Sequence, residues 1–218
     1  MTVNLATGVG TWGDAQGDSY TNIENVVGSD YDDTLTGDAN ANVLEGGAGA
    51  DVLDGGAGSD TASYESSSSG VTVNLATNSA TGGDAQGDTF TSIENLTGSN
   101  YNDTLTGDAN ANILAGGLGN DTLSGGDGSD LFIFQMGDGT DTINGGAGGG
   151  WIDAISLQDA SGGSKLGTYG VDWTVSLTEG TIDGQDANGL DLSDDADGVI
   201  TLSDGSIANF FDIERIDF

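Results

Sequence analysis

Glycine and aspartate recur at a fixed interval in this sequence, in stretches with little apolar surface. The segment GGAGADVLDGGAGSD, residues 46–60, has only Val52 and Leu53 as bulky apolar side chains. Carboxylates and closely spaced backbone carbonyls are oxygen ligands of the kind that hard divalent cations bind. The chemistry indicated by this segment is therefore cation binding, and the spacing shows which elements must position the ligands.

The spacing is nine residues. Nonapeptides begin at Gly28, Gly37, Gly46 and Gly55, then at Gly98, Gly107, Gly116 and Gly125, and a further one covers residues 136–144 after a two-residue slip. Position six is Asp33, Asn42, Asp51, Asp60, Asp103, Asn112, Asp121, Asp130 and Asp141, and position eight is apolar throughout. A longer period of about 70 residues is also present, because the sequence from Thr2 returns from Thr72. The chain before Ser129 is thus largely two copies of one unit.

Each nonapeptide combines a turn with a short strand. Its last three residues alternate outward, inward and outward, so position eight faces a thin core. Its first six residues must turn sharply, and glycine permits the positive φ that such turns need. Calcium takes six to eight oxygen ligands with flexible geometry, whereas magnesium requires a tighter octahedron. Zinc would require histidine or cysteine, and the chain has neither.

The pattern G-G-x-G-x-D-x-U-x, where U is a large apolar residue, is matched in full by GGAGADVLD, GGLGNDTLS and GGDGSDLFI. These repeats resemble the haemolysin-type RTX family, over roughly residues 2–153. The resemblance implies an all-β fold, a right-handed parallel β-roll with several calcium ions between stacked turns. It pairs turn 28–33 with 46–51, 37–42 with 55–60, 98–103 with 116–121 and 107–112 with 125–130. The turn ending at Asp141 would stack on the turn ending at Asp121.

The expected calcium ligands lie in these turns. They are Gly28, Asp30, Asp33, Gly37, Asn42, Gly46, Gly47, Gly49, Asp51, Gly55, Gly56, Gly58, Asp60, Gly98, Asn100, Asp103, Gly107, Asn112, Gly116, Gly117, Gly119, Asp121, Gly125, Gly126, Gly128, Asp130, Gly137, Gly139 and Asp141. We expect weaker sites beside the uncharged Asn42 and Asn112. The loop GGDAQGD, residues 82–88, would hold an additional ion through Asp84 and Asp88 or be a solvated acidic turn.

We expect five segments along the chain. Residues 1–27 form an amino-terminal rung, 28–63 the first repeat block, 64–97 connecting strands and an acidic loop, 98–153 the second block and 154–218 a β-rich cap. VTVNL (71–75) and SIENL (92–96) are expected to be longer strands, and the regular roll is expected to end near Asp153. In the cap, alternating residues predict strands at Trp173–Leu177 and Ile200–Leu202, and Asp204–Gly205 predicts a hairpin turn. Residues 193–204 partly match an EF-hand loop but lack its first aspartate, so an acidic hairpin turn is the competing interpretation.

Charge and composition exclude several functions. Thirty-six acidic residues face two basic ones, for a net charge of -34. No basic patch can form, so binding to nucleic acid or to an anionic membrane surface is not expected. The absence of histidine and cysteine excludes a Ser-His-Asp triad and a cysteine nucleophile, and we assign no catalytic residue. No 18-residue apolar stretch is present, and the amino terminus does not read as a secretory signal.

The resemblance also suggests a biological setting. An RTX array followed by an acidic β-rich end resembles the carboxy-terminal modules of exoproteins and adhesins that Gram-negative bacteria export by type I secretion machinery. We therefore expect a non-catalytic module that folds on calcium outside the cell or on its surface. The alternatives are a calcium-dependent surface that binds glycan or ice, through Thr34, Thr36, Thr104, Thr106 and Thr122, and an accessory domain of a secreted hydrolase.

Overall fold

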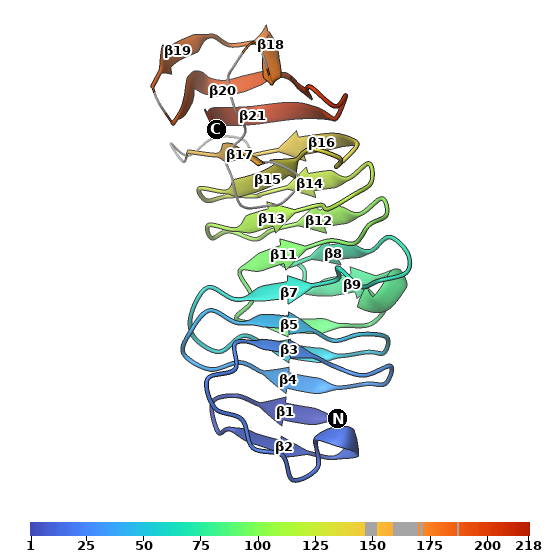
Figure 1. Cartoon of the computed structure of the whole chain (residues 1–218). Helices are drawn as coiled ribbons and strands as arrows, with labels where there is room; N and C mark the ends of the chain where they lie inside the picture. Colours follow the sequence, from blue (N-terminus) through green and yellow to red (C-terminus); the bar gives the residue numbers. More distant parts are fainter. Residues whose placement is uncertain (147–151, 159–169, 171, 187) are drawn as a thin grey trace.

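The computed structural model describes residues 1–146, 152–158, 170, 172–186 and 188–218. These residues form an elongated stack of short strands, with the amino terminus near one end (Figure 1). Within the described ranges the helices are two single-turn 3-10 helices, η1 (Gly13–Ala15) and η2 (Gly83–Ala85). No helix in these ranges has the length and apolar character needed to cross a membrane.

Two sheets contain the strands. The five-stranded sheet has the order β10 (Thr89–Thr91), β6 (Val52–Asp54), β4 (Thr34–Thr36), β1 (Thr2–Asn4) and β2 (Val9–Thr11). The main path of the 16-stranded sheet is β3 (Asn25–Val27), β5 (Val43–Glu45), β7 (Thr61–Ser63), β11 (Asn95–Thr97), β13 (Ile113–Ala115), β15 (Leu131–Gln135), β17 (Ala154–Gln158), β21 (Ile207–Asp217), β16 (Thr140–Asn144), β14 (Thr122–Ser124), β12 (Thr104–Thr106), β8 (Thr72–Asn74) and β9 (Ser79–Thr81). Strands β18 (Trp173–Glu179), β19 (Ile182–Gln185) and β20 (Gly189–Leu202) lie off this path.

Each coil of the roll uses two nonapeptides. The chain passes from β4 on one face to β5 on the other, returns to β6 and crosses again to β7, and the strands pair in parallel with those two repeats away. Position-eight side chains are therefore in register, as in the pairs Leu35–Leu53 and Leu105–Leu123. They are fully buried from Leu35 to Ile143, which confirms the parallel β-roll and its thin inner core.

The second copy of the long unit stacks directly on the first. Strand β10 pairs in parallel with β6, and β11 pairs in parallel with β7. In each copy a short antiparallel hairpin precedes the repeat block, formed by β1 with β2 and by β8 with β9. The expectation that VTVNL and SIENL are longer strands is wrong, because β8 and β11 have three residues each, like the strands of the repeats.

The parallel ladder continues past Asp153, where the sequence predicts the regular roll to end. Strand β17 pairs in parallel with β15 over five residues. Strand β21 then supplies the last rung of both faces, because it pairs with β16 through residues 207–211 and with β17 through residues 215–217. A segment far along the chain thus completes the stack.

The carboxy-terminal strands cap this end of the roll. Strand β20 pairs antiparallel with β18, β19 and β21. The predicted strands and the turn at Asp204–Gly205 are confirmed, and residues 193–202 lie in β20 instead of a loop. Trp173, Phe210, Ile213 and Ile216 are buried, as expected for a small conventional core, whereas Phe211 is 42% exposed. The expected core residue Trp151 lies outside the described residues.

Candidate metal-binding turns

The turns of the repeats form two columns, one along each edge of the roll. One edge carries turns 28–33, 46–51, 98–103 and 116–121, and the other carries 37–42, 55–60, 107–112 and 125–130. Within each column, the position-six side chain of one turn accepts a hydrogen bond from the backbone N–H of position six in the turn two repeats before it. These N–H to Oδ1 bonds join Asp33 to Asp51 (2.7 Å), Asn42 to Asp60 (2.7 Å), Asp103 to Asp121 (2.8 Å), Asn112 to Asp130 (2.8 Å) and Asp121 to Asp141 (3.0 Å). The stacking of the predicted turn pairs is confirmed.

The residue at position two distinguishes two kinds of repeat. Where position two is serine or aspartate, its backbone N–H donates to the position-six side chain. These bonds join Ser29 to Asp33 Oδ2 (2.5 Å), Asp38 to Asn42 Oδ1 (2.7 Å), Ser99 to Asp103 Oδ2 (2.6 Å) and Asp108 to Asn112 Oδ1 (2.8 Å). In the four repeats that begin with Gly-Gly, Oδ2 of the position-six aspartate is buried and has no hydrogen-bond partner; these are Asp51, Asp60, Asp121 and Asp130. A buried carboxylate oxygen without a partner calls for a bound water or ion.

The first two positions of these repeats are glycine for different reasons. Gly46 and Gly116 do not have a positive φ. A Cβ at these positions would lie 2.1 Å from Oδ2 of Asp51 and 2.2 Å from Oδ2 of Asp121, so the carboxylate needs the space. Position two does need glycine conformationally, as the φ of 88° at Gly117 shows.

Backbone carbonyls also converge between stacked turns. A Cβ on Gly28 would lie 2.1 Å from the carbonyl oxygen of Gly46, and a Cβ on Gly98 would lie 2.4 Å from that of Gly116. The same approach joins Gly37 to Gly55 and Gly107 to Gly125. Each stacked pair therefore places a main-chain oxygen close to a side-chain oxygen of position six, which is a carboxylate oxygen at Asp33 and Asp103 and an amide oxygen at Asn42 and Asn112.

Burial disfavours the ionised form of these carboxylates. Removal from water raises the pKa of Asp51 to about 7, and the charges of Asp88, Asp33 and Asp32 add to the rise. The same cause raises the pKa of Asp121 to about 8 and that of Asp130 to about 7. The pKa of Asp60 is also raised by desolvation. A cation between the turns would reverse this effect, because an opposite charge at short range favours the carboxylate.

This donor set fits calcium. The oxygens are carboxylates and carbonyls, which are hard ligands, and the chain has no histidine or cysteine to hold zinc. Among the described residues, no group of three or more acidic side chains is placed to hold a metal ion. That carbonyl oxygens supply most of the ligands of a calcium ion stays a prediction.

The other expected ligands occupy varied positions. Asp30 and Asn100 are exposed at the turn tips. Asp88 is buried and accepts hydrogen bonds from Asp51 N–H (2.9 Å) and from the Tyr64 hydroxyl (2.9 Å). Both of its oxygens thus have partners, and an ion held by Asp84 and Asp88 stays a prediction.

Three carboxylates that the sequence did not predict as ligands extend one column, the one that contains turns 55–60 and 125–130. Glu94 Oε2 accepts the N–H of Asp60 (2.9 Å), Asp153 Oδ1 accepts the N–H of Asp130 (2.8 Å) and Glu214 Oε2 accepts the N–H of Asp153 (2.7 Å). The two glutamates could be found from a short motif that recurs in the sequence. Residues 22–26, 92–96 and 212–216 read NIENV, SIENL and DIERI. In each copy a residue of positive φ precedes Ile-Glu.

Comparison with protein-family models gives a direct match to these turns. Residues 27–62 and 93–132 match the model of the RTX calcium-binding nonapeptide repeat, which is detected in four copies. The chain carries RTX calcium-binding repeats. The matched segments include the four aspartates with the unpaired Oδ2 atoms. The RTX segments therefore form a calcium-binding β-roll, and this repeat is a binding unit rather than a catalytic one.

Comparison with whole proteins adds little. No curated protein matches the chain. Among solved structures, the crystal structure of the extracellular lipase LipA from Serratia marcescens is similar, with 15% sequence identity and a TM-score of 0.26. The match covers 93% of this chain and 41% of the lipase, so the chain spans about two-fifths of that protein's length.

The raised pKa values predict how the calcium-free chain responds to pH. For Asp51, Asp121 and Asp130, a folded-state pKa of about 7 to 8 lies above the ordinary value of 3.8. Their protonation therefore favours the folded state fully below pH 3.8, and this contribution is lost as pH rises through 7 to 8. We expect calcium-free protein to be more ordered at pH 5 than at pH 8, as measured by far-UV circular dichroism. Equal disorder at both pH values would contradict the prediction.

Proposed function

We propose that the RTX segments act as a calcium-dependent folding module, with ions held between the stacked turns. Asp51, Asp60, Asp121 and Asp130 would supply the charged ligands, and the glycine-rich turns 28–33, 37–42, 98–103 and 107–112 would supply carbonyl oxygens. The observation that carries this proposal is the set of four buried Oδ2 atoms without hydrogen-bond partners. The remaining expected turn ligands belong to the same sites.

Energetics support the coupling of folding to calcium. The net charge of -34 opposes compaction, and the core has one apolar side chain per nonapeptide. A site with a dissociation constant of about 0.1 mM adds about 1–2 kcal/mol at millimolar calcium. Several such sites along one ladder add up, whereas at micromolar calcium they add almost nothing.

This dependence suits an extracellular module. We propose that the chain is part of a larger exoprotein or adhesin that passes through type I secretion machinery unfolded and folds outside the cell or on its surface. RTX repeats are typical of secreted exoproteins, which supports this setting. The partner in transport would be transient, and calcium would be the lasting ligand.

A calcium titration tests the proposed function. We expect the purified chain to be largely disordered in chelator and to become compact and β-rich in millimolar calcium, because the ions offset repulsion between carboxylates. Circular dichroism and resistance to protease would follow the change, with magnesium as the control. A chain that stays equally ordered in chelator would overturn the proposal, and so would an equal response to magnesium.

A second candidate function is a calcium-dependent adhesive surface for glycan or ice. One observation favours it: Thr72, Thr104, Thr122 and Thr142 are exposed and lie in register on adjacent strands. The other threonines of the hypothesis are half-buried: Thr34 and Thr36 on β4 and Thr106 on β12. A glycan array and an ice-affinity assay, each with and without calcium, would test this function, and binding that survives replacement of Thr104 and Thr122 by valine would count against it.

A further inference from the structure

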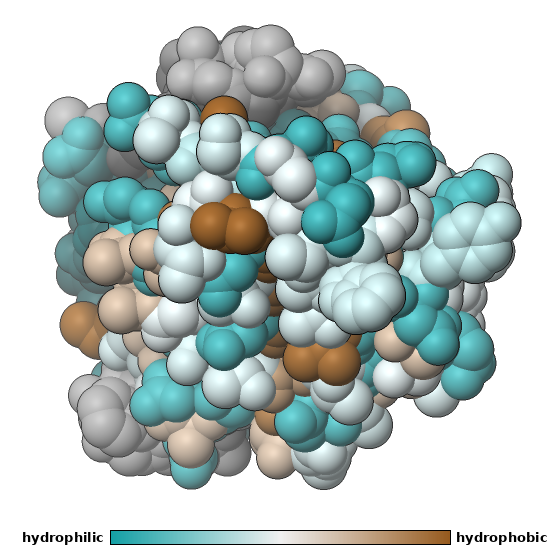
Figure 2. All heavy atoms as spheres, turned by 90° about the horizontal axis from the view of Figure 1, so that it is seen from below, coloured by the Kyte–Doolittle hydropathy of each residue, from teal (hydrophilic) through white to brown (hydrophobic). Residues whose placement is uncertain are grey.

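The amino-terminal end of the roll is an open surface. Strand β3 pairs with β5 on its inner side and has no strand on its outer side among the described residues. Figure 2 looks onto this end and shows apolar patches between polar side chains. Ile23 is 41% exposed and Val27 is 63% exposed there. We call residues 18–27 the amino-terminal surface.

The corresponding surface of the second copy is covered. Residues 88–97 match residues 18–27 at a spacing of 70, with Asp88 for Asp18, Ile93 for Ile23, Glu94 for Glu24 and Asn95 for Asn25. In the second copy Asp88 is 2% exposed, Ile93 6% and Asn95 6%, because β6 and β7 of the first copy lie against them. Two equivalent surfaces are therefore present in the molecule: one is covered, at its centre, and the other is open, at its amino-terminal end.

The contacts at the covered surface are specific. Asp51 N–H donates to Asp88 Oδ1, and Asp60 N–H donates to Glu94 Oε2, both at 2.9 Å. The backbone N–H groups of Glu94 and Asn95 both donate to the Asp60 carbonyl, at 3.1 and 2.9 Å. The acidic and amide side chains that make or flank these bonds are identical at Asp18, Glu24 and Asn25. The open surface thus carries the groups that recognise the end of a repeat block.

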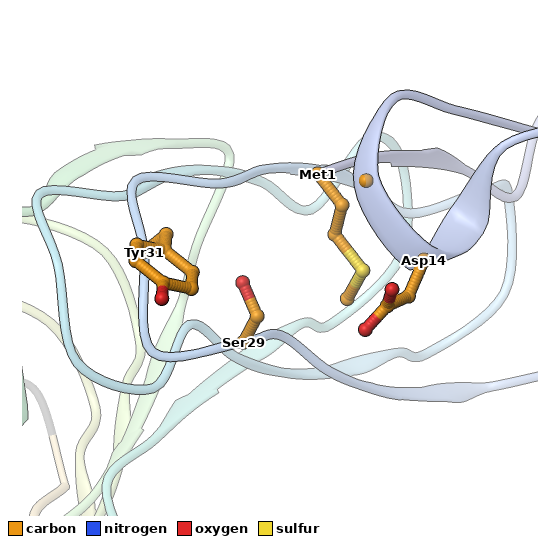
Figure 3. A pocket seen from close by; sticks show the side chains of 5 residues that line it. Met1, Asp14, Ser29 and Tyr31 are labelled. Carbon is orange, nitrogen blue, oxygen red and sulfur yellow. The ribbon is translucent and has the colours of Figure 1, made fainter.

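A hollow lies beside this surface. Met1, Gly13, Asp14, Ser29 and Tyr31 line it (Figure 3). At the matching place in the second copy, Ser67 Oγ accepts the N–H of Asp84 (3.1 Å), so residues 64–70 of the first copy fill the space. The amino group of Met1 contacts Asp33 Oδ1, as the N–H of Val71 contacts Asp103 Oδ1. Met1 thus takes the place at the amino-terminal end that Val71, the residue after the segment 64–70, takes in the second copy.

We propose that the amino-terminal surface docks the last coil of a further nonapeptide unit, joined to residue 1 through a connector like residues 64–71. The covered junction inside the chain is the template for this contact. The occupant is defined by its chemistry: backbone N–H groups of two position-six aspartates that reach Asp18 and Glu24, and a parallel strand that pairs with β3.

A three-unit chain tests the proposal. Residues 1–71 are placed ahead of residues 2–218, which leaves the whole of this chain in place. In millimolar calcium we expect the amide hydrogens of Glu24 and Asn25 in the middle unit to exchange at least about tenfold more slowly than in the parent chain, because they gain a carbonyl acceptor. Hydrogen exchange by NMR measures this. Unchanged exchange, whether the added unit folds apart or not at all, would overturn the proposal.

Two matched substitutions sharpen the test. Ile23 and Ile113 are each 41% exposed in the parent, but only Ile23 lies on the amino-terminal surface. In the three-unit chain, Ile23→Asp in the middle unit should restore the parent exchange rate, and Ile113→Asp should leave the protection in place. Equal effects of the two would contradict the docking surface. The calcium response of the parent chain is measured separately, so a failure of calcium-dependent folding is distinguished from a failure of docking.

Discussion

Replacing Asp51, Asp60, Asp121 and Asp130 together by asparagine is expected to abolish the folding of the chain on calcium addition. These four side chains hold the buried Oδ2 atoms without partners. Asparagine keeps one oxygen but removes the charge, and the affinity of a calcium site depends strongly on the number of charged ligands. We expect no calcium response up to concentrations about a hundredfold above the midpoint of the parent. Circular dichroism and calorimetric titration measure it.

A control variant separates ligation from net charge. Asp14, Glu179, Asp183 and Asp194 are exposed and lie outside the repeat turns, and their replacement by asparagine, or by glutamine at Glu179, changes the net charge by the same four units. We expect this variant to fold on calcium with a midpoint close to that of the parent. If the two variants behaved alike, repulsion between charges and not coordination at the turns would explain the calcium response.

Gly116→Ala is expected to destabilise the calcium-bound roll and to remove one ion. The new Cβ would lie 2.2 Å from Asp121 Oδ2, and that carboxylate also accepts the N–H of Asp103 (2.8 Å). Overpacking of this kind costs about 1–3 kcal/mol, and the lost site removes about 1–2 kcal/mol more at millimolar calcium. Urea unfolding in calcium and the calorimetric ion count give the two effects.

Two further variants test the cause of this loss. Gly184 in the cap has no positive φ, and its nearest contact to a new Cβ would be 3.1 Å, so Gly184→Ala should have little effect. The Cβ of Asp121 also lies 2.9 Å from the new Cβ. Removing the whole side chain relieves the clash, so Gly116→Ala should cost much less in an Asp121→Gly background. Additive free energies of unfolding would contradict the steric explanation.

Much of the roll follows from the phase of the nonapeptides. Leucine at position eight and aspartate at position six recur together, so the pattern fixes which side chains face the core and which turns stack. Leu105 above Leu123 and Asp103 N–H on Asp121 Oδ1 are direct consequences of that phase. The sequence shows which repeats have serine and which have glycine at position two. It does not show the effect on Oδ2 of position six, because that effect depends on the direction of the position-two backbone N–H.

The end of the roll could not be predicted in the same way. Asp153 follows Gly145 at a spacing that breaks the nonapeptide rule, yet its Oδ1 still accepts the N–H of Asp130. Residues between β17 and β21 separate the last two rungs, so periodicity cannot show that residues 207–217 return to the stack. Glu214 ends the same column, because its Oε2 accepts the N–H of Asp153.

The two ends of the roll are stabilised by different kinds of contact. Strand β21 seals one end through a packed aromatic and aliphatic cluster, in which the rings of Trp173 and Phe218 lie 5.0 Å apart. This cluster contains no glycine-rich turn. We expect it to act as the folding nucleus onto which the coils of the roll are added one after another. Position-six contacts are 18 residues apart, so mechanical force applied at the amino terminus should peel the array in steps of that length while the sealed end holds longest.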